Sequence, residues 1–133
     1  MFNLNNDSKT LTLVGLILEG LLLFLGALFG LIFGLIFGGM TSSEFSDQSA
    51  VPMIVIFVIF GFFYLIGLTF FIINTIVYKK LKSPIPFSTA NKLLTYQMVI
   101  GIIYLLSNTL VGILYLLSSI FGKRALDEQN LRN

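Results

Sequence analysis

Glu19 is the only acidic side chain inside an apolar run of this chain, in the segment LILEGLLL. An acidic residue at such a place is costly to bury in hydrocarbon, so it is a functional candidate by default. On a helix with about 100° between residues, its side chain lies within about 40° of Gly15, Gly26 and Gly30. Glu19 is therefore predicted to face other helices, where an acid could carry a proton or bind a cation.

A structural role is the alternative for Glu19. If the bilayer begins near Gly20, Glu19 lies at the cytoplasmic boundary and close to the lysine-rich segment 79–92. It would then be an acid buried for packing, or the partner of a lysine in an interfacial ion pair. We favour this structural role over transport. The lysines within reach would be Lys79, Lys80, Lys82 and Lys92.

A few uncharged polar side chains interrupt the other apolar runs. Such groups most often hydrogen-bond between helices, with about 1 kcal/mol gained for each bond. We expect that structural role for them rather than a polar pathway across the membrane. The residues are Thr69, Asn74, Gln97, Ser107 and Asn108.

The sequence lacks the residues that most catalytic and metal sites need. It contains no cysteine and no histidine, which excludes thiolate chemistry, imidazole proton transfer and the commonest metal ligands. It also contains no phosphate-binding loop, no zinc-protease motif and no nucleophile elbow. We therefore expect no enzyme, no metal and no cofactor. The net charge of +2 comes from residues that flank the apolar runs, so nucleic acid is not an expected partner.

The composition predicts an integral membrane protein. Of the 133 residues, 56% are hydrophobic and only 11% are charged, whereas a soluble domain carries about 25% charged residues. Apolar runs cover residues 11–39, 51–78 and 93–121, and each exceeds the ~20 residues that cross a bilayer. The expected fold is an all-α polytopic transmembrane helical bundle of three or four packed helices, forming one membrane domain over residues 1–133.

The number of passes depends on the last apolar run. The 40–50 segment has no basic residue and the 79–92 segment has four lysines, so the first is expected outside and the second in the cytoplasm, with a cytoplasmic N-terminus. One long helix over 93–121 would put the basic C-terminal tail outside. A hairpin turning at 107–109 would return it to the cytoplasm, although each arm would be short for a full crossing. Charge favours four passes and length favours three; we favour four.

Four glycines recur at every fourth position of the first run: Gly26, Gly30, Gly34 and Gly38. They form a glycine zipper, which allows close approach of helix backbones in a membrane, and Gly15 is expected to pack on the same helix face. We expect it to pack against the phenylalanine-rich second span. Contact with a second copy or another membrane protein, and the lining of a pore, are the alternatives.

The segments KTLTLVGLILEG, NKLLTYQ and NTLVGILYLLSSIFGKR carry a resemblance over most of the chain. In these segments the chain resembles uncharacterised small multi-pass membrane proteins of Gram-positive bacteria, of the domain-of-unknown-function type. The resemblance implies a protein of the cell membrane with no established activity. The expected function is a non-enzymatic packing, assembly or accessory role, with the lipid bilayer and a homo-oligomer or membrane-protein partner as contacts.

Two other classes agree with the length of the chain. Small multidrug-resistance transporters have a glutamate in the first helix, which Glu19 resembles, and a transporter of this type would be coupled to protons or cations. This chain departs from them because it has no tryptophan and its last two segments are fused. The second class contains the holins and the bacteriocin-immunity proteins, although holins often end in a more basic tail than KRALDEQNLRN.

Overall fold

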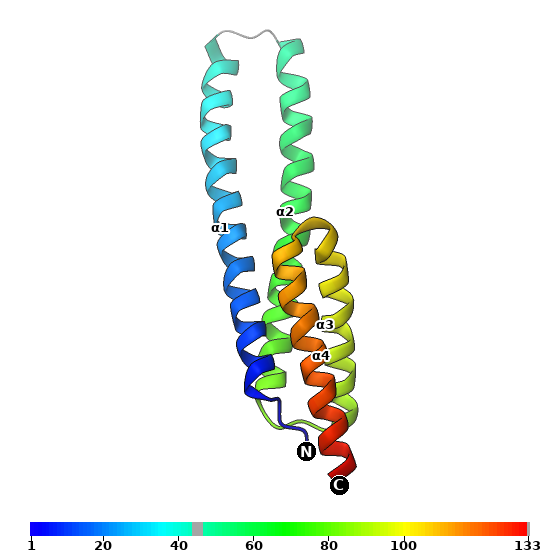
Figure 1. The fold of residues 1–133 in the computed structure, drawn as a ribbon. Helices are drawn as coiled ribbons and strands as arrows, with labels where there is room; N and C mark the ends of the chain where they lie inside the picture. The colour runs from blue at the N-terminus through cyan, green and yellow to red at the C-terminus, as the bar shows by residue number, and fades with distance from the viewer. Residues whose placement is uncertain (44–46, 133) are drawn as a thin grey trace. The chain divides into compact units, whose positions relative to one another are not determined.

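The structure is a computed structural model, which describes the backbone of residues 1–43 and 47–132 and the side chains of residues 1–36 and 54–131. The described residues fold into four helices (Figure 1), and the predicted all-α bundle is confirmed with four helices in this part of the chain rather than three. The helices are α1 (Asn6–Ser43), α2 (Asp47–Lys82), α3 (Phe87–Ser107) and α4 (Thr109–Arg132).

Three of these helices contain segments that are long and apolar enough to cross a membrane. The segments are Asn6–Ile36 in α1, Ile54–Lys82 in α2 and Thr109–Leu131 in α4. Most of the large apolar side chains described on α1 and α2 lie exposed on the surface of the protein. In hydrocarbon such exposure costs little, because lipid tails are as apolar as leucine.

The chain divides into two compact units. The first unit contains Met1–Glu19 and Phe71–Asn133, and therefore the start of α1, the end of α2 and the whole of α3 and α4. The second unit is Gly20–Phe70, the remaining part of the α1–α2 hairpin.

The helices extend beyond the apolar runs from which they were predicted. The 40–50 segment between the first two apolar runs is partly helical, because α1 continues to Ser43 and α2 begins at Asp47; residues 44–46 lie outside the described part of the chain. The lysines of the expected 79–92 loop partly belong to α2, which ends at Lys82. Lysine is a good helix former, and its charge is favourable at a helix C-terminus. The apolar pattern alone therefore underestimates the length of these helices.

The apolar core of the first unit lies where the N-terminal segment meets the ends of three helices. Phe2 forms a two-way backbone pairing with Ile85, with N···O distances of 2.7 and 3.2 Å. The side chain of Phe2 is fully buried. The core residues come from the N-terminal segment, α2, α3 and α4, and are Phe2, Leu4, Val77, Leu81, Ala90, Leu94, Ala125 and Leu126. This core fixes the first residues of the chain against the C-terminal helix.

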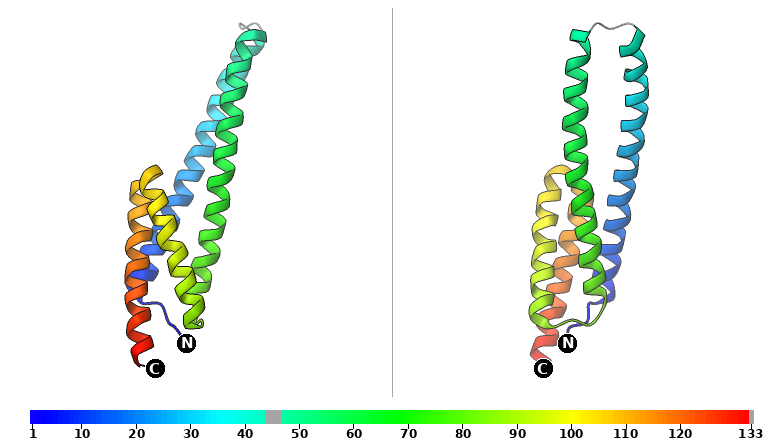
Figure 2. Two further views of the ribbon diagram at one scale, coloured as in Figure 1. Left: turned by 90° about the vertical axis from the view of Figure 1, so that its right-hand side faces the viewer. Right: turned by 180° about the vertical axis from the view of Figure 1, so that it is seen from behind.

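Helices α3 and α4 lie side by side as a hairpin (Figure 2). The turn is Asn108, whose N–H donates to the Tyr104 carbonyl, while its own carbonyl accepts from the Gly112 N–H at 2.9 Å. Backbone groups at such a turn need partners within the protein where lipid supplies none. The two helices then approach so closely that glycine is required at the contact. A Cβ atom on Gly112 would lie 2.5 Å from the Leu105 nitrogen, and one on Gly101 2.8 Å from the Leu116 nitrogen.

Gly112→Ala is expected to lower the stability of the chain, because the new methyl group meets backbone atoms that cannot move aside. Overpacking of this kind costs about 1–3 kcal/mol. Gly61→Ala is the matched control, since a Cβ atom at Gly61 meets nothing within 4 Å. Thermal unfolding in detergent, followed by circular dichroism, should show a lower Tm for Gly112→Ala only. Equal Tm values for the two variants would contradict the close helix contact.

Candidate functional site

Glu19 lies buried in the first unit, with 6% of its surface exposed. Its Oε1 accepts a hydrogen bond from the Tyr104 hydroxyl at 2.7 Å, and its Oε2 accepts one from the Tyr115 hydroxyl. The Asn74 side-chain amide donates to both carboxylate oxygens at 3.3 Å. Tyr96 completes the group, since its hydroxyl donates to Asn74 Oδ1 at 3.2 Å. We call these five residues the Glu19 cluster.

The Glu19 cluster takes side chains from all four helices. Glu19 belongs to α1, Asn74 to α2, and Tyr115 to α4, while Tyr96 and Tyr104 belong to α3. The bond from Tyr96 fixes the orientation of the Asn74 amide, so that its NH₂ group faces the carboxylate. One carboxylate is therefore held by hydrogen-bond donors on each of the other three helices.

Gly15 makes this arrangement possible. A Cβ atom on Gly15 would lie only 2.7 Å from Cε1 of the Tyr115 ring. Because glycine has no side chain, the ring lies directly across α1 and its hydroxyl reaches Glu19, one turn further along the helix. Gly15, which the sequence assigned to helix packing, thus positions a donor of the Glu19 cluster.

All of the donors to Glu19 are neutral. The interfacial ion pair with a lysine is not among the contacts of Glu19 in the described residues. The lysines proposed as partners, Lys79, Lys80, Lys82 and Lys92, are exposed. A buried carboxylate without a cation depends on its hydrogen bonds, and loss of one such bond leaves charge uncompensated. The cluster is therefore the most demanding polar site in the described part of the chain.

A second group of buried polar side chains, the hydroxyl file, consists of Ser8, Thr12, Gln97 and Ser118. The Ser8 hydroxyl donates to the Ser118 carbonyl at 2.7 Å, and the Ser118 hydroxyl can reach the Ser8 carbonyl at 2.8 Å. The Thr12 hydroxyl bonds the Ser118 hydroxyl and accepts from Gln97 Nε2 at 2.8 Å. The file joins α1 to α3 and α4.

Two buried oxygen atoms near this file have no hydrogen-bond partner among the described residues. They are Gln97 Oε1 and Asn5 Oδ1. Gln97 is 5% exposed, so its free oxygen lies inside the protein. An unpaired buried acceptor is costly and is commonly satisfied by a bound water molecule.

The remaining polar residues predicted as site candidates do not join either group. Ser107 is exposed and Asn108 forms the α3–α4 turn. Thr69, in the second unit, donates to the Leu65 carbonyl of its own helix at 2.8 Å. Of the predicted polar set, only Asn74 and Gln97 are buried partners of other helices.

In the second unit, the glycines of α1 face aromatic side chains of α2. Cβ atoms on Gly26, Gly30 and Gly34 would lie 3.8, 3.2 and 4.0 Å from the rings of Tyr64, Phe60 and Phe57 respectively. The Tyr64 hydroxyl donates to the Leu23 carbonyl at 3.2 Å. Gly38 lies outside the residues whose surroundings the structure describes.

Sequence reasoning found Asn74 but missed the tyrosine donors of the Glu19 cluster. Tyr104 lies four residues before Asn108 and Tyr115 seven residues after it, and the hairpin that turns there brings their rings together, with centroids 6.0 Å apart. Polar-tipped aromatic residues on both sides of a predicted turn were the signal that could have found them. Ser8, Thr12 and Ser118 carry no such signal, because single hydroxyl residues are common in membrane helices.

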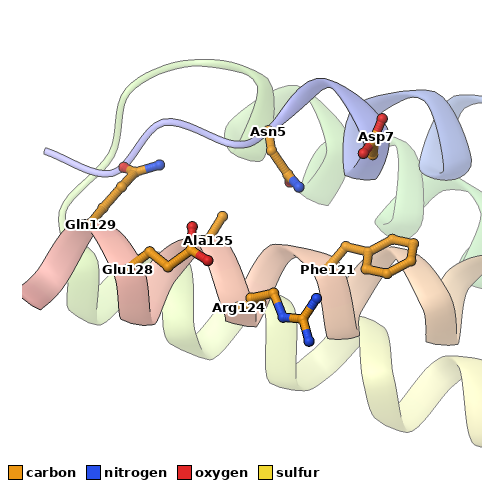
Figure 3. Close-up of a pocket in the computed structure, with 7 residues that line it drawn as sticks. All are labelled: Asn5, Asp7, Phe121, Arg124, Ala125, Glu128 and Gln129. Carbon is orange, nitrogen blue, oxygen red and sulfur yellow. The ribbon is translucent and has the colours of Figure 1, made fainter.

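A cavity of about 290 Å³ opens beside the hydroxyl file, between the start of α1 and the end of α4 (Figure 3). Asn5 and Asp7 line it on one side. On the α4 side the lining residues are Phe121, Arg124, Ala125, Glu128 and Gln129. The cavity is large enough for several water molecules.

Comparison with protein-family models, curated proteins and solved structures finds no match to this chain. The resemblance to small membrane proteins of Gram-positive bacteria therefore stays a prediction.

Tyr115→Phe is expected to destabilise the chain more than Tyr64→Phe, although each change removes one hydroxyl. Tyr115 donates to a carboxylate, whereas Tyr64 donates to a backbone carbonyl. Hydrogen bonds to charged groups contribute about 1.5–3 kcal/mol and neutral ones about 0.5–1.5 kcal/mol. Thermal unfolding of both variants in detergent tests the difference. Equal losses would show that Tyr115 contributes no more than an ordinary bond.

Proposed function

We propose that this chain is a small multi-pass protein of the cell membrane with a non-enzymatic packing, assembly or accessory role. The observation that carries the proposal is the Glu19 cluster, in which one carboxylate is hydrogen-bonded by side chains from the three other helices. A charge held in this way fixes the relative position of the helices. In hydrocarbon, where apolar burial gives little driving force, such bonds are among the few that specify one arrangement.

The proposed topology has both termini in the cytoplasm. In the first unit the Asn3 N–H donates to Gln129 Oε1 at 2.9 Å, and Gln129 Nε2 donates to the Asn3 carbonyl at 2.6 Å. These bonds hold the two ends of the chain together, which supports placing them on the same side. The basic residues of segment 79–92 favour the cytoplasm for that side. The 40–50 segment is then proposed to lie outside.

Labelling of single cysteines tests this topology, because the natural chain contains none. Ser83→Cys places an exposed thiol directly after α2, and Asn130→Cys places one near the end of α4. Both positions are proposed to lie on the cytoplasmic side. In sealed cells, a membrane-impermeant maleimide should label Ser46→Cys but neither of the other two variants. After the cells are opened, all three should react. Labelling of Asn130→Cys in sealed cells would contradict a cytoplasmic C-terminus.

A proton- or cation-coupled transporter using Glu19 is the second candidate. It is favoured by one observation, namely that the carboxylate has only neutral donors. Such a group can take up a proton without first losing a cationic partner. The structural role and the transporter differ in the effect expected when the charge of Glu19 is removed.

Glu19→Gln separates the candidates. The new NH₂ group must face a donor of the cluster, so we expect a loss of about 1–3 kcal/mol of stability. Glu128→Gln is the matched control at an exposed position. If the role is structural, the parent chain in vesicles carries no proton flux down an imposed pH gradient, and Glu19→Gln lowers Tm. A flux in the parent that Glu19→Gln abolishes would favour the transporter, and an unchanged Tm would contradict the structural proposal.

A further inference from the structure

The cavity between the start of α1 and the end of α4, here called the α1–α4 cavity, carries charges of both signs. Asp7 lines it on the α1 side, and Arg124 and Glu128 line it on the α4 side (Figure 3). Along α4, Arg124 follows Phe121 by three residues and Glu128 follows Arg124 by four, so the three share one face of the helix. The cavity therefore combines a guanidinium, two carboxylates and an aromatic ring.

The charged groups of the α1–α4 cavity have no partners within the described part of the chain. Asp7, Arg124 and Glu128 are exposed and form no ion pair or side-chain hydrogen bond with another described residue. The Asn5 amide nitrogen faces α4 across the cavity (Figure 3), and it also has no acceptor among these residues. The cavity thus offers two donor groups and two anionic acceptors to a bound molecule.

The α1–α4 cavity lies where the apolar runs end. The run 11–39 begins four residues after Asp7, and the run 93–121 ends at Phe121. With these runs in a bilayer, the cavity lies at the level of the lipid headgroups, which flank the hydrocarbon core. Leu117, one turn before Phe121 on α4, is an exposed apolar side chain. A lipid whose headgroup occupies the cavity can therefore lay its acyl chains along apolar helix surface.

We propose that the α1–α4 cavity binds the headgroup of a lipid that carries both a phosphate and a primary ammonium group, the chemistry of phosphatidylethanolamine. The Arg124 guanidinium, a planar fork of donors, holds the phosphate together with the Asn5 amide. The Asp7 and Glu128 carboxylates accept hydrogen bonds from the ammonium. The site is additional to the proposed function, and it requires only that the apolar runs lie in a bilayer.

The charges of the α1–α4 cavity select this headgroup over simpler ones. An ammonium has three N–H donors, whereas the quaternary nitrogen of choline has none to give to the carboxylates. A headgroup with a phosphate alone would leave both carboxylates without a cation and place like charges together. A metal ion would leave Arg124 without an anion, and the described residues contain no group of three acidic side chains that could hold one.

The size of the α1–α4 cavity agrees with this ligand. Its volume of about 290 Å³ is roughly ten times the ~30 Å³ that one water molecule occupies in the liquid. This space accommodates a phosphate joined to ethanolamine, while the glycerol and acyl chains remain outside.

Native mass spectrometry of the full-length protein in detergent tests the proposal. Phosphatidylethanolamine, phosphatidylcholine and phosphatidylglycerol with identical acyl chains are titrated separately. We expect the first to bind about tenfold more tightly than the other two, the factor that one charge-assisted hydrogen bond supplies. Arg124→Gln should weaken its binding by a similar factor. Asp7→Asn should reduce its affinity to that of phosphatidylcholine.

Two variants control for a general effect of charge. Lys123→Gln and Asp127→Asn each remove a charge of the same sign at a neighbouring position of α4, and neither residue lines the α1–α4 cavity. Both should bind phosphatidylethanolamine as the parent does. Thermal unfolding of every variant without added lipid checks that the fold is kept.

Equal affinity of the parent for the three lipids would overturn the assigned headgroup. An equal loss of binding in Lys123→Gln and Arg124→Gln would overturn the assigned site, because any nearby charge would then have the same effect. Soluble phosphoethanolamine is the final arm of the experiment. If it displaces the lipid at equal concentration, the free compound is the ligand and the assignment to a membrane lipid is wrong; if it does not, the lipid is supported.

Discussion

The first unit depends on one constraint, that the Glu19 carboxylate is buried without a cation. Its hydrogen-bond donors come from α2, α3 and α4, so no helix can shift without breaking a bond to a charged oxygen. An unsatisfied buried charge costs several times more than a misplaced apolar contact. In a bilayer, where apolar side chains gain little from meeting each other, this difference is what selects one packing of the helices.

Glycine acts in two distinct ways around this constraint. Gly101 and Gly112 let α3 and α4 meet through their backbones, which brings the rings of Tyr104 and Tyr115 together. Gly15 instead leaves room for a single ring, so that the Tyr115 hydroxyl reaches Glu19. The close contact between α3 and α4 therefore brings the two tyrosine donors together, and the absence of a side chain at Gly15 lets the Tyr115 hydroxyl reach Glu19. Three of the regularly spaced glycines, Gly26, Gly30 and Gly34 in the second unit, face the rings of Tyr64, Phe60 and Phe57 instead.

The apolar runs predicted the helical class, and the charge pattern favoured the hairpin at Asn108 that the structure contains. Helix ends were not predictable from hydropathy, because Lys79 to Lys82 continue α2 by propensity and favourable charge rather than by apolarity. Glu19 and Asn74 stood out as polar residues in apolar runs, and both lie in the cluster. Tyr104 and Tyr115 did not, since tyrosine at a membrane helix is normally assigned to the interface. Their role depends on a tertiary contact that one sequence does not encode locally.

The polar groups of the first unit bear on two properties, the specificity of helix packing and the charge of Glu19. Hydrogen bonds to a carboxylate make a helix arrangement specific, and under the second candidate function the same carboxylate would gain a proton and lose its charge. On protonation, Glu19 would lose one acceptor position and gain a donor, while the Tyr and Asn groups around it already donate. Two donors cannot share one bond, so a hydroxyl in the cluster would have to rotate and become an acceptor. Tyr104 and Tyr115 can do this, whereas the Asn74 NH₂ group cannot. Protonation of Glu19, if the second candidate function holds, would thus reorient one hydroxyl group, on α3 or α4, while the link to Asn74 on α2 is retained.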